Sequence, residues 1–115
     1  PAMPDASLPP DGSPPHSPAA ERTLARLLAE RSARRGEFRL SSGRTSTLYI
    51  DARLTTMHPE GLTLVGPAGL AAIEQAGWRV DAVGGLTLGA DPVAYAVSYA
   101  SALAGRPVRA FTVRK

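Results

Sequence analysis

The spacing of hydrophobic positions divides the chain into helical and extended segments. Apolar side chains in the segment 24–28 recur on one helical face, with charged residues elsewhere, and this period predicts a helix over 18–35. Ser17 is a suitable N-cap and Pro18 a suitable first helical residue. Gly36 is expected to end this helix.

After residue 37 the period shortens to that of strands. Residues 38–43 and 45–54 predict two short strands of an antiparallel hairpin with a turn at 42–44. Asp51 and Arg53 are separated by one residue, so we expect both on one face of the second strand, where they could form an exposed ion pair.

A second helix is predicted over 59–76, with Gly77 at its end. Pro67 lies inside it and is expected to kink or interrupt the helix, because proline lacks an amide hydrogen and clashes with the preceding turn. His58 is expected to form a hydrogen bond at the start of this helix, and Trp78 is expected to be a packing anchor.

The last third of the chain predicts a strand–helix–strand unit. Residues 80–85 predict a short buried strand, and the glycine-rich loop 84–91 leads to a helix over 92–104 that ends at Gly105. The segment 107–115 predicts the final strand. Such a unit forms a parallel crossover, so the fold class is α/β, with a helix and a hairpin in front of the core.

Composition limits the ordered part and the class of protein. Residues 1–17 hold most of the 11 prolines and few large apolar side chains, so we expect a disordered tail there and one small domain over 18–115. The absence of cysteine excludes disulfides and thiolate metal sites. No apolar run is long enough for a membrane span, and no apolar signal-peptide core is found, so we expect a cytoplasmic protein without a membrane partner.

The charge of the chain is consistent with a small anionic ligand and with nucleic acid, and equally with arginines that are merely solvated. The net charge is +3, and Lys115 is the only lysine among 13 basic residues. The planar fork of arginine suits carboxylates and phosphates. Only Arg31, Arg34 and Arg35 cluster, and no basic segment is interleaved with aromatic residues, which argues against nucleic acid as a partner.

The loop 84–91 is a candidate anion site, because ligands of parallel sheets bind beyond the carboxyl ends of the strands. Its three glycines permit positive φ and a close backbone approach, and its amides could hold a phosphate at the start of the next helix. Arg114 and Lys115 end the next strand and are expected at the same edge. The alternatives are a tight structural turn and two solvated charges. No nucleophile–base pair and no metal-ligand cluster is found, so no catalytic residue and no metal ligand is assigned.

Three motifs occur in order: FRLSSGRTSTLYIDAR, MHPEG, and VGGLTLGADPVA leading to AFTVRK. Together they resemble the orotate phosphoribosyltransferases over about residues 20–115. The resemblance implies a type I phosphoribosyltransferase-like α/β fold, with an incomplete parallel sheet, flanking helices, and an amino-terminal helix plus β-hairpin. It also implies the transfer of ribose 5-phosphate from phosphoribosyl pyrophosphate to orotate, which gives orotidine 5'-monophosphate in UMP biosynthesis. Mg²⁺ is implied to bind together with the donor.

The resemblance also assigns binding residues. Tyr49 and Ile50 match hairpin residues that lie against the orotate ring. Arg114 matches an arginine that contacts the diphosphate, and Lys115 matches a lysine that reaches the neighbouring subunit's active site, which implies a homodimer with shared sites. The implied site for phosphoribosyl pyrophosphate consists of Leu86, Thr87, Leu88, Gly89, Arg114 and Lys115.

The sequence departs from some bacterial members at two places. Ser41 stands where they have a donor-binding lysine, and Leu88-Gly89 stands where they have a tyrosine–lysine pair, so those contacts are not assigned. A non-proline cis peptide, frequent in this loop of the fold, is expected at Thr87-Leu88.

The family continues beyond the motif that ends at Lys115 with a catalytic loop and a turn that holds ribose 5-phosphate. We therefore expect the amino-terminal portion of the enzyme, inactive by itself. Two alternatives are a phosphoribosyltransferase-fold regulator, which salt-sensitive nucleic-acid binding would favour, and a non-catalytic nucleotide-binding module.

Overall fold

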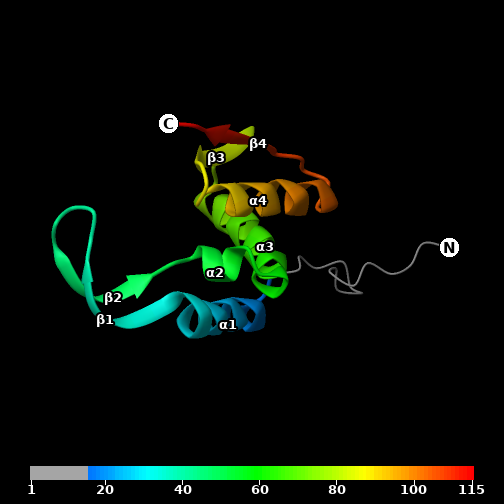
Figure 1. The fold of residues 1–115 in the computed structure, drawn as a ribbon. Helices are drawn as coiled ribbons and strands as arrows, with labels where there is room; N and C mark the ends of the chain where they lie inside the picture. The colour runs from blue at the N-terminus through cyan, green and yellow to red at the C-terminus, as the bar shows by residue number, and fades with distance from the viewer. Residues whose placement is uncertain (1–15) are drawn as a thin grey trace.

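Five helical segments and four strands follow one another in residues 16–115, the part of the chain that the computed structural model describes (Figure 1). In chain order they are α1 (Pro18–Leu27), η1 (Leu28–Ser32), β1 (Ala33–Arg39), β2 (Thr45–Ile50), α2 (Arg53–Thr56), α3 (Pro59–Ala76), β3 (Ala82–Leu86), α4 (Asp91–Leu103) and β4 (Arg109–Val113). β1 and β2 form an antiparallel sheet, and β3 and β4 form a separate parallel sheet. The predicted disorder of the tail lies mostly outside the described residues and stays a prediction.

The start of α1 is as predicted. The Ser17 hydroxyl accepts a hydrogen bond from the Ala20 amide at 3.1 Å, and Pro18 is the first helical residue. His16, the other described residue of the predicted tail, lies with Nε2 3.7 Å from the Glu21 carboxylate. The helix start therefore involves the last two residues of the segment that we expected to be disordered.

The end of this helix differs from the prediction. The α-helix ends at Leu27, a short π-helical turn η1 continues to Ser32, and the chain is extended from Ala33. Residues 33–35 pair with β2 and do not continue the helix, so tertiary contacts override their helical propensity. Gly36 is not a helix cap, because it lies inside β1 where the pairing register shifts.

The antiparallel hairpin is confirmed, with different strand limits. Arg34 pairs with Tyr49 and Arg39 with Thr45, so β1 begins five residues before the predicted start at 38. β2 ends at Ile50 rather than at 54, because the chain turns into the short helix α2. The hairpin extends away from the helices (Figure 1).

The helix α3 has the predicted limits. The His58 Nδ1 atom accepts a hydrogen bond from the Glu60 amide at 3.2 Å, and Gly77 ends the helix with φ 70°. The helix is continuous through Pro67, so the predicted interruption is wrong. The helix packs closely on α4 beside the proline, since a β-carbon at Gly66 would overlap the Ala96 carbonyl oxygen. Trp78 is 70% exposed among the described residues, so its predicted role as a packing anchor is wrong.

The parallel strand–helix–strand unit is confirmed. Ala82 pairs with Arg109 and Leu86 with Val113, and α4 packs on both strands. β3 is less buried than predicted, because α4 is the only described helix in extensive contact with this sheet. The Ser98 hydroxyl donates to the Val108 carbonyl at 2.7 Å, and this hydrogen bond joins α4 to the residue before β4.

The buried apolar side chains lie largely on α4 and beside it: Leu27, Ala94, Val97, Ala100 and Val108. Figure 1 shows the resulting order of layers, with the β3–β4 sheet on one side of α4 and α3 on the other. No helix of residues 16–115 is long and apolar enough to cross a membrane.

Candidate functional site

The loop 86–89 connects β3 to α4 at the carboxyl end of the parallel strands. The Thr87 amide donates to the Val113 carbonyl at 2.9 Å, and the Ala90 amide donates to the Leu86 carbonyl at 3.2 Å. The peptide bond Thr87-Leu88 is cis, as predicted. The Thr87 amide therefore holds the loop against the end of β4, and the Ala90 amide, just after the loop, closes a turn back to Leu86.

Two adjacent amides of this loop are free of internal partners. Within residues 16–115, the amide of Leu88 and the amide of Gly89 donate to no backbone carbonyl and to no side chain. A β-carbon added at Gly89 would meet no described atom within 4 Å, so the loop is open on that side. Adjacent free amides can bind an anion by hydrogen bonds that the loop itself does not use.

The glycines act differently from the prediction. Positive φ does not occur at Gly84, Gly85 or Gly89, so a left-handed backbone is not the reason for them. Gly84 is required by packing, because a β-carbon there would overlap the Phe111 carbonyl oxygen of β4. At Gly85 it would lie 2.8 Å from the Ala90 β-carbon. Two of the three glycines thus allow close approach within the fold, and the third faces open space.

A hydrogen-bond network that the sequence did not reveal supports the loop. The Asp91 carboxylate accepts from the Thr87 hydroxyl at 2.5 Å and from the Thr112 hydroxyl at 3.1 Å. The Tyr95 hydroxyl lies 3.0 Å from the Thr112 hydroxyl oxygen. Asp91 is the first residue of α4 and Thr112 lies in β4, so the carboxylate joins the loop, the helix and the strand.

The two cations of the candidate site follow directly on β4. Arg114 and Lys115 are exposed, and neither forms an ion pair with another residue in the described range. The residue before them, Val113, is the one whose carbonyl binds the Thr87 amide. The structure thus brings the predicted loop and the predicted strand end together at one edge of the parallel sheet.

The hairpin residues lie elsewhere. Tyr49 and Ile50 end β2, with exposed fractions of 44% and 56%. The Tyr49 ring packs against Phe38, with centroids 5.6 Å apart. In Figure 1 the hairpin and the β3–β4 sheet lie at different ends of the molecule, with the helices between them. The described chain therefore does not bring the two hairpin residues together with the loop 86–89.

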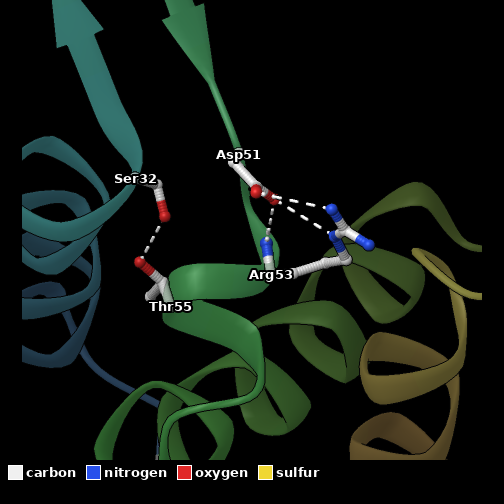
Figure 2. Close-up of polar contacts among 4 residues, drawn as sticks. All are labelled: Ser32, Asp51, Arg53 and Thr55. Atoms are coloured by element: carbon white, nitrogen blue, oxygen red, sulfur yellow. Dashed lines mark hydrogen bonds and ion pairs between the residues drawn. The ribbon is translucent and has the colours of Figure 1, made fainter.

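A polar junction fixes the base of the hairpin (Figure 2). The buried hydroxyls of Ser32 and Thr55 lie 2.6 Å apart, and the Asp51 amide donates to the Ser32 carbonyl at 3.0 Å. Thr55 also donates to the Leu27 carbonyl at 3.3 Å. The residue after Ile50 is thereby tied to the end of η1, which sets where β2 leaves the helices.

The predicted pair of Asp51 and Arg53 is confirmed, but not its place on a strand. Asp51 Oδ1 accepts from the backbone amide and from Nε of Arg53, both at 3.2 Å (Figure 2). Arg53 begins α2, so the carboxylate also satisfies an amide of the first helical turn. The side-chain hydrogen bond from Arg53 holds the pKa of Asp51 below its ordinary value of 3.8.

Comparison with known proteins identifies orotate phosphoribosyltransferases as relatives, although no model of a known protein family matches the chain. Orotate phosphoribosyltransferase of Aquifex aeolicus is 43% identical over 95 residues, which are 80% of this chain and 51% of the relative. The enzyme of Corynebacterium glutamicum is 47% identical over 96 residues, which are 84% of this chain and 50% of the relative. The chain thus spans about half the length of these relatives.

Solved structures give the same result for the fold. A phosphoribosyltransferase from Corynebacterium diphtheriae matches with a TM-score of 0.70 and 37% identity, over 84% of this chain and 51% of that one. Mycobacterium tuberculosis orotate phosphoribosyltransferase in complex with phosphoribosyl pyrophosphate matches with a TM-score of 0.63 and 34% identity, over 86% of this chain and 48% of that one. The resemblance to orotate phosphoribosyltransferases is confirmed over this length. The described chain has a type I phosphoribosyltransferase-like α/β fold with an incomplete parallel sheet.

Proposed function

We propose that the protein is an orotate phosphoribosyltransferase of UMP biosynthesis, and that this chain supplies its diphosphate-binding edge and its orotate-binding hairpin. In this reaction the bond from C1 of the ribose to a diphosphate oxygen breaks and a bond from C1 to a ring nitrogen of orotate forms. The ring nitrogen loses its proton and pyrophosphate leaves. The observation that carries the proposal is made within residues 16–115, where the adjacent amides of Leu88 and Gly89 have no acceptor and the cations Arg114 and Lys115 have no ion-pair partner at the same edge of the sheet.

The loop and the strand end suit a leaving diphosphate. Leu88 and Gly89 would donate their amides to its oxygens, while Leu86 and Thr87 fix the loop on β4. Donors fixed before the reaction stabilise the charge that develops in the transition state without reorganisation. Arg114 would pair with the diphosphate through its planar fork of donors, as the resemblance implies.

The hairpin would provide the orotate contact. Tyr49 and Ile50 present partly exposed apolar surface at the end of β2, which suits a planar ring.

Lys115 would reach the active site of a second subunit, so the proposal includes a homodimer with shared sites. Sedimentation or light scattering of the whole protein tests the dimer, and a monomer at assay concentration would contradict it.

Mg²⁺ enters the proposal only together with the donor. Residues 16–115 contain no group of three histidine or acidic side chains that could hold a metal ion, so these residues do not fit a protein-made metal site. Mg²⁺ commonly binds through substrate phosphates and keeps several waters. The cytoplasmic location expected from the sequence stays a prediction.

Orotate-dependent release of pyrophosphate from phosphoribosyl pyrophosphate tests the proposal in the whole protein. Arg114→Ala is expected to raise KM for the donor by about tenfold or more, since a charge-assisted bidentate pair is lost. Arg109→Ala is the matched control, because Arg109 is an exposed arginine at the other end of the same strand. Equal effects of the two substitutions would contradict the assigned diphosphate edge. The 115 residues alone are still predicted to show no turnover.

The regulator alternative gains no support from the structure. Arg31 lies in η1, and Arg34 and Arg35 are successive residues of β1. Successive side chains of a strand point to opposite faces, so Arg34 and Arg35 do not share one face of the hairpin. Salt-sensitive binding of DNA or RNA together with a lack of turnover in the whole protein would reverse this conclusion.

A further inference from the structure

We propose that Asp91 is a positioning residue for the diphosphate loop, at the centre of a hydrogen-bond chain that runs from Tyr95 through Thr112 to Asp91 and from Thr87 to Asp91. This inference rests on the proposed function of the loop and deepens it. Asp91 itself does not contact the ligand in this account. It fixes the conformation in which the neighbouring amides of Leu88 and Gly89 stay free.

The direction of each hydrogen bond in the chain follows from the donors available. The oxygens of the Asp91 side chain accept, and the hydroxyls of Thr87 and Thr112 both donate to them. A threonine hydroxyl has one hydrogen, and that of Thr112 is used on Asp91. Tyr95 must therefore donate to Thr112, over 3.0 Å.

The network ties three elements at the place where the loop needs support. Thr87 lies in the loop, Asp91 begins α4, and Thr112 lies in β4 next to the residue that binds the Thr87 amide. The Asp91 amide also donates to the Leu88 carbonyl at 3.2 Å. The loop is thus bound on both sides of Leu88, while the Leu88 amide itself remains available.

The charge of Asp91 makes the proposal distinguishable from a simple electrostatic role. A carboxylate close to a diphosphate site repels the ligand, so its removal alone should tighten binding of pyrophosphate. If Asp91 positions the loop, its removal should weaken binding instead, because the free amides lose their fixed orientation. The sign of the change therefore decides between the two roles.

The test measures the Kd of inorganic pyrophosphate for the full chain by calorimetry, with amide NMR spectra to verify folding. Asp91→Ala is expected to weaken binding roughly tenfold or more. Asp91→Asn, which keeps the shape and can accept one hydroxyl while donating to the other, should restore most of the affinity. Unchanged or tighter binding by a folded Asp91→Ala variant would overturn the proposal.

A milder pair of substitutions keeps the test valid if Asp91→Ala does not fold. Tyr95→Phe removes only the terminal donor and should weaken pyrophosphate binding about two- to tenfold. Tyr99→Phe is the matched control, since Tyr99 lies one turn further along α4, is 70% exposed, and forms no side-chain hydrogen bond with residues 16–115. Equal affinities of the two tyrosine variants would overturn the proposed chain. If the unaltered protein binds no pyrophosphate, the proposed function fails and the positioning role fails with it. If the unaltered protein binds pyrophosphate and the Asp91→Ala variant binds it equally well, only the positioning role is overturned.

Discussion

Replacement of Gly89 by alanine separates the folding of the loop 86–89 from its proposed ligand binding. Gly89 has no positive φ, and its added β-carbon would meet no described atom within 4 Å. Replacing a glycine by alanine at such a position reduces the entropy of the unfolded chain and stabilises a protein by about 0.4–1 kcal/mol. For a domain of this size we expect the melting temperature to rise by about 2–8 °C.

The same methyl group would project into the open space beside Gly89, from which we propose that the ligand approaches the loop. We expect the Gly89→Ala protein to bind inorganic pyrophosphate at least about tenfold more weakly, which corresponds to about 1.4 kcal/mol. Scanning calorimetry measures the first effect and titration calorimetry the second. Gly84→Ala is the contrasting variant, because its β-carbon would overlap the Phe111 carbonyl and should lower the stability by about 1–3 kcal/mol.

Two outcomes would refute this reasoning. Unaltered pyrophosphate affinity of a stable Gly89→Ala protein would mean that the ligand does not approach the loop from the open side. A lower melting temperature of that variant would mean that the loop needs glycine for its own conformation.

Two further predictions concern packing and pH. Gly66→Ala should cost about 1–3 kcal/mol of stability in a denaturant titration, because its β-carbon would overlap a backbone carbonyl of α4. Gly69→Ala should cost less, since its β-carbon would approach side-chain atoms of Val97, with Cγ2 at 2.6 Å, and no backbone atom of α4; an equal loss would contradict this account of the helix contact. Carboxyl NMR should show Asp51 titrating below 3.8, with Arg53→Gln moving its pKa back upward. The difference in unfolding free energy between the unaltered protein and the Arg53→Gln variant should be present above the ordinary pKa of Asp51 and should disappear as the pH falls through its lowered pKa. A difference that persists at still lower pH would contradict this role of the ion pair.

The elements that could be predicted from the sequence are those with local determinants. Ser17 and Pro18 begin α1, His58 begins α3, and Gly77 ends it, through contacts with residues only two to four positions away. The parallel unit followed from its order of strand, glycine-rich loop, helix and strand. Local capping residues thus predicted the starts of α1 and α3 and the helix ends near Gly77 and Gly105, and only the end expected at Gly36 was wrong.

The predictions that failed depended on distant contacts. The change from helix to strand at Ala33 depends on pairing with Ile50, and the bond between Ser32 and Thr55 joins residues 23 positions apart. Trp78 follows the helix cap and was expected to be a packing anchor, but no described element covers it.

The candidate site divides in the same way. The loop and the strand end were predicted from glycines, cations and the direction of parallel strands, and they do lie at one edge. The role of Asp91 could not be predicted, because its partner Thr112 is 21 positions away and no spacing rule relates the two. Which loop amides stay free likewise becomes clear only when all their possible acceptors are known.

The most direct test of the central claim is an amide NMR titration of the protein with inorganic pyrophosphate. If the loop 86–89 binds the diphosphate, the amide signals of Leu88 and Gly89 should shift most, in a saturable manner, and the Ala82 amide at the start of β3 should shift little. Saturable shifts located elsewhere, or no shift of these two amides at millimolar pyrophosphate, would contradict the account.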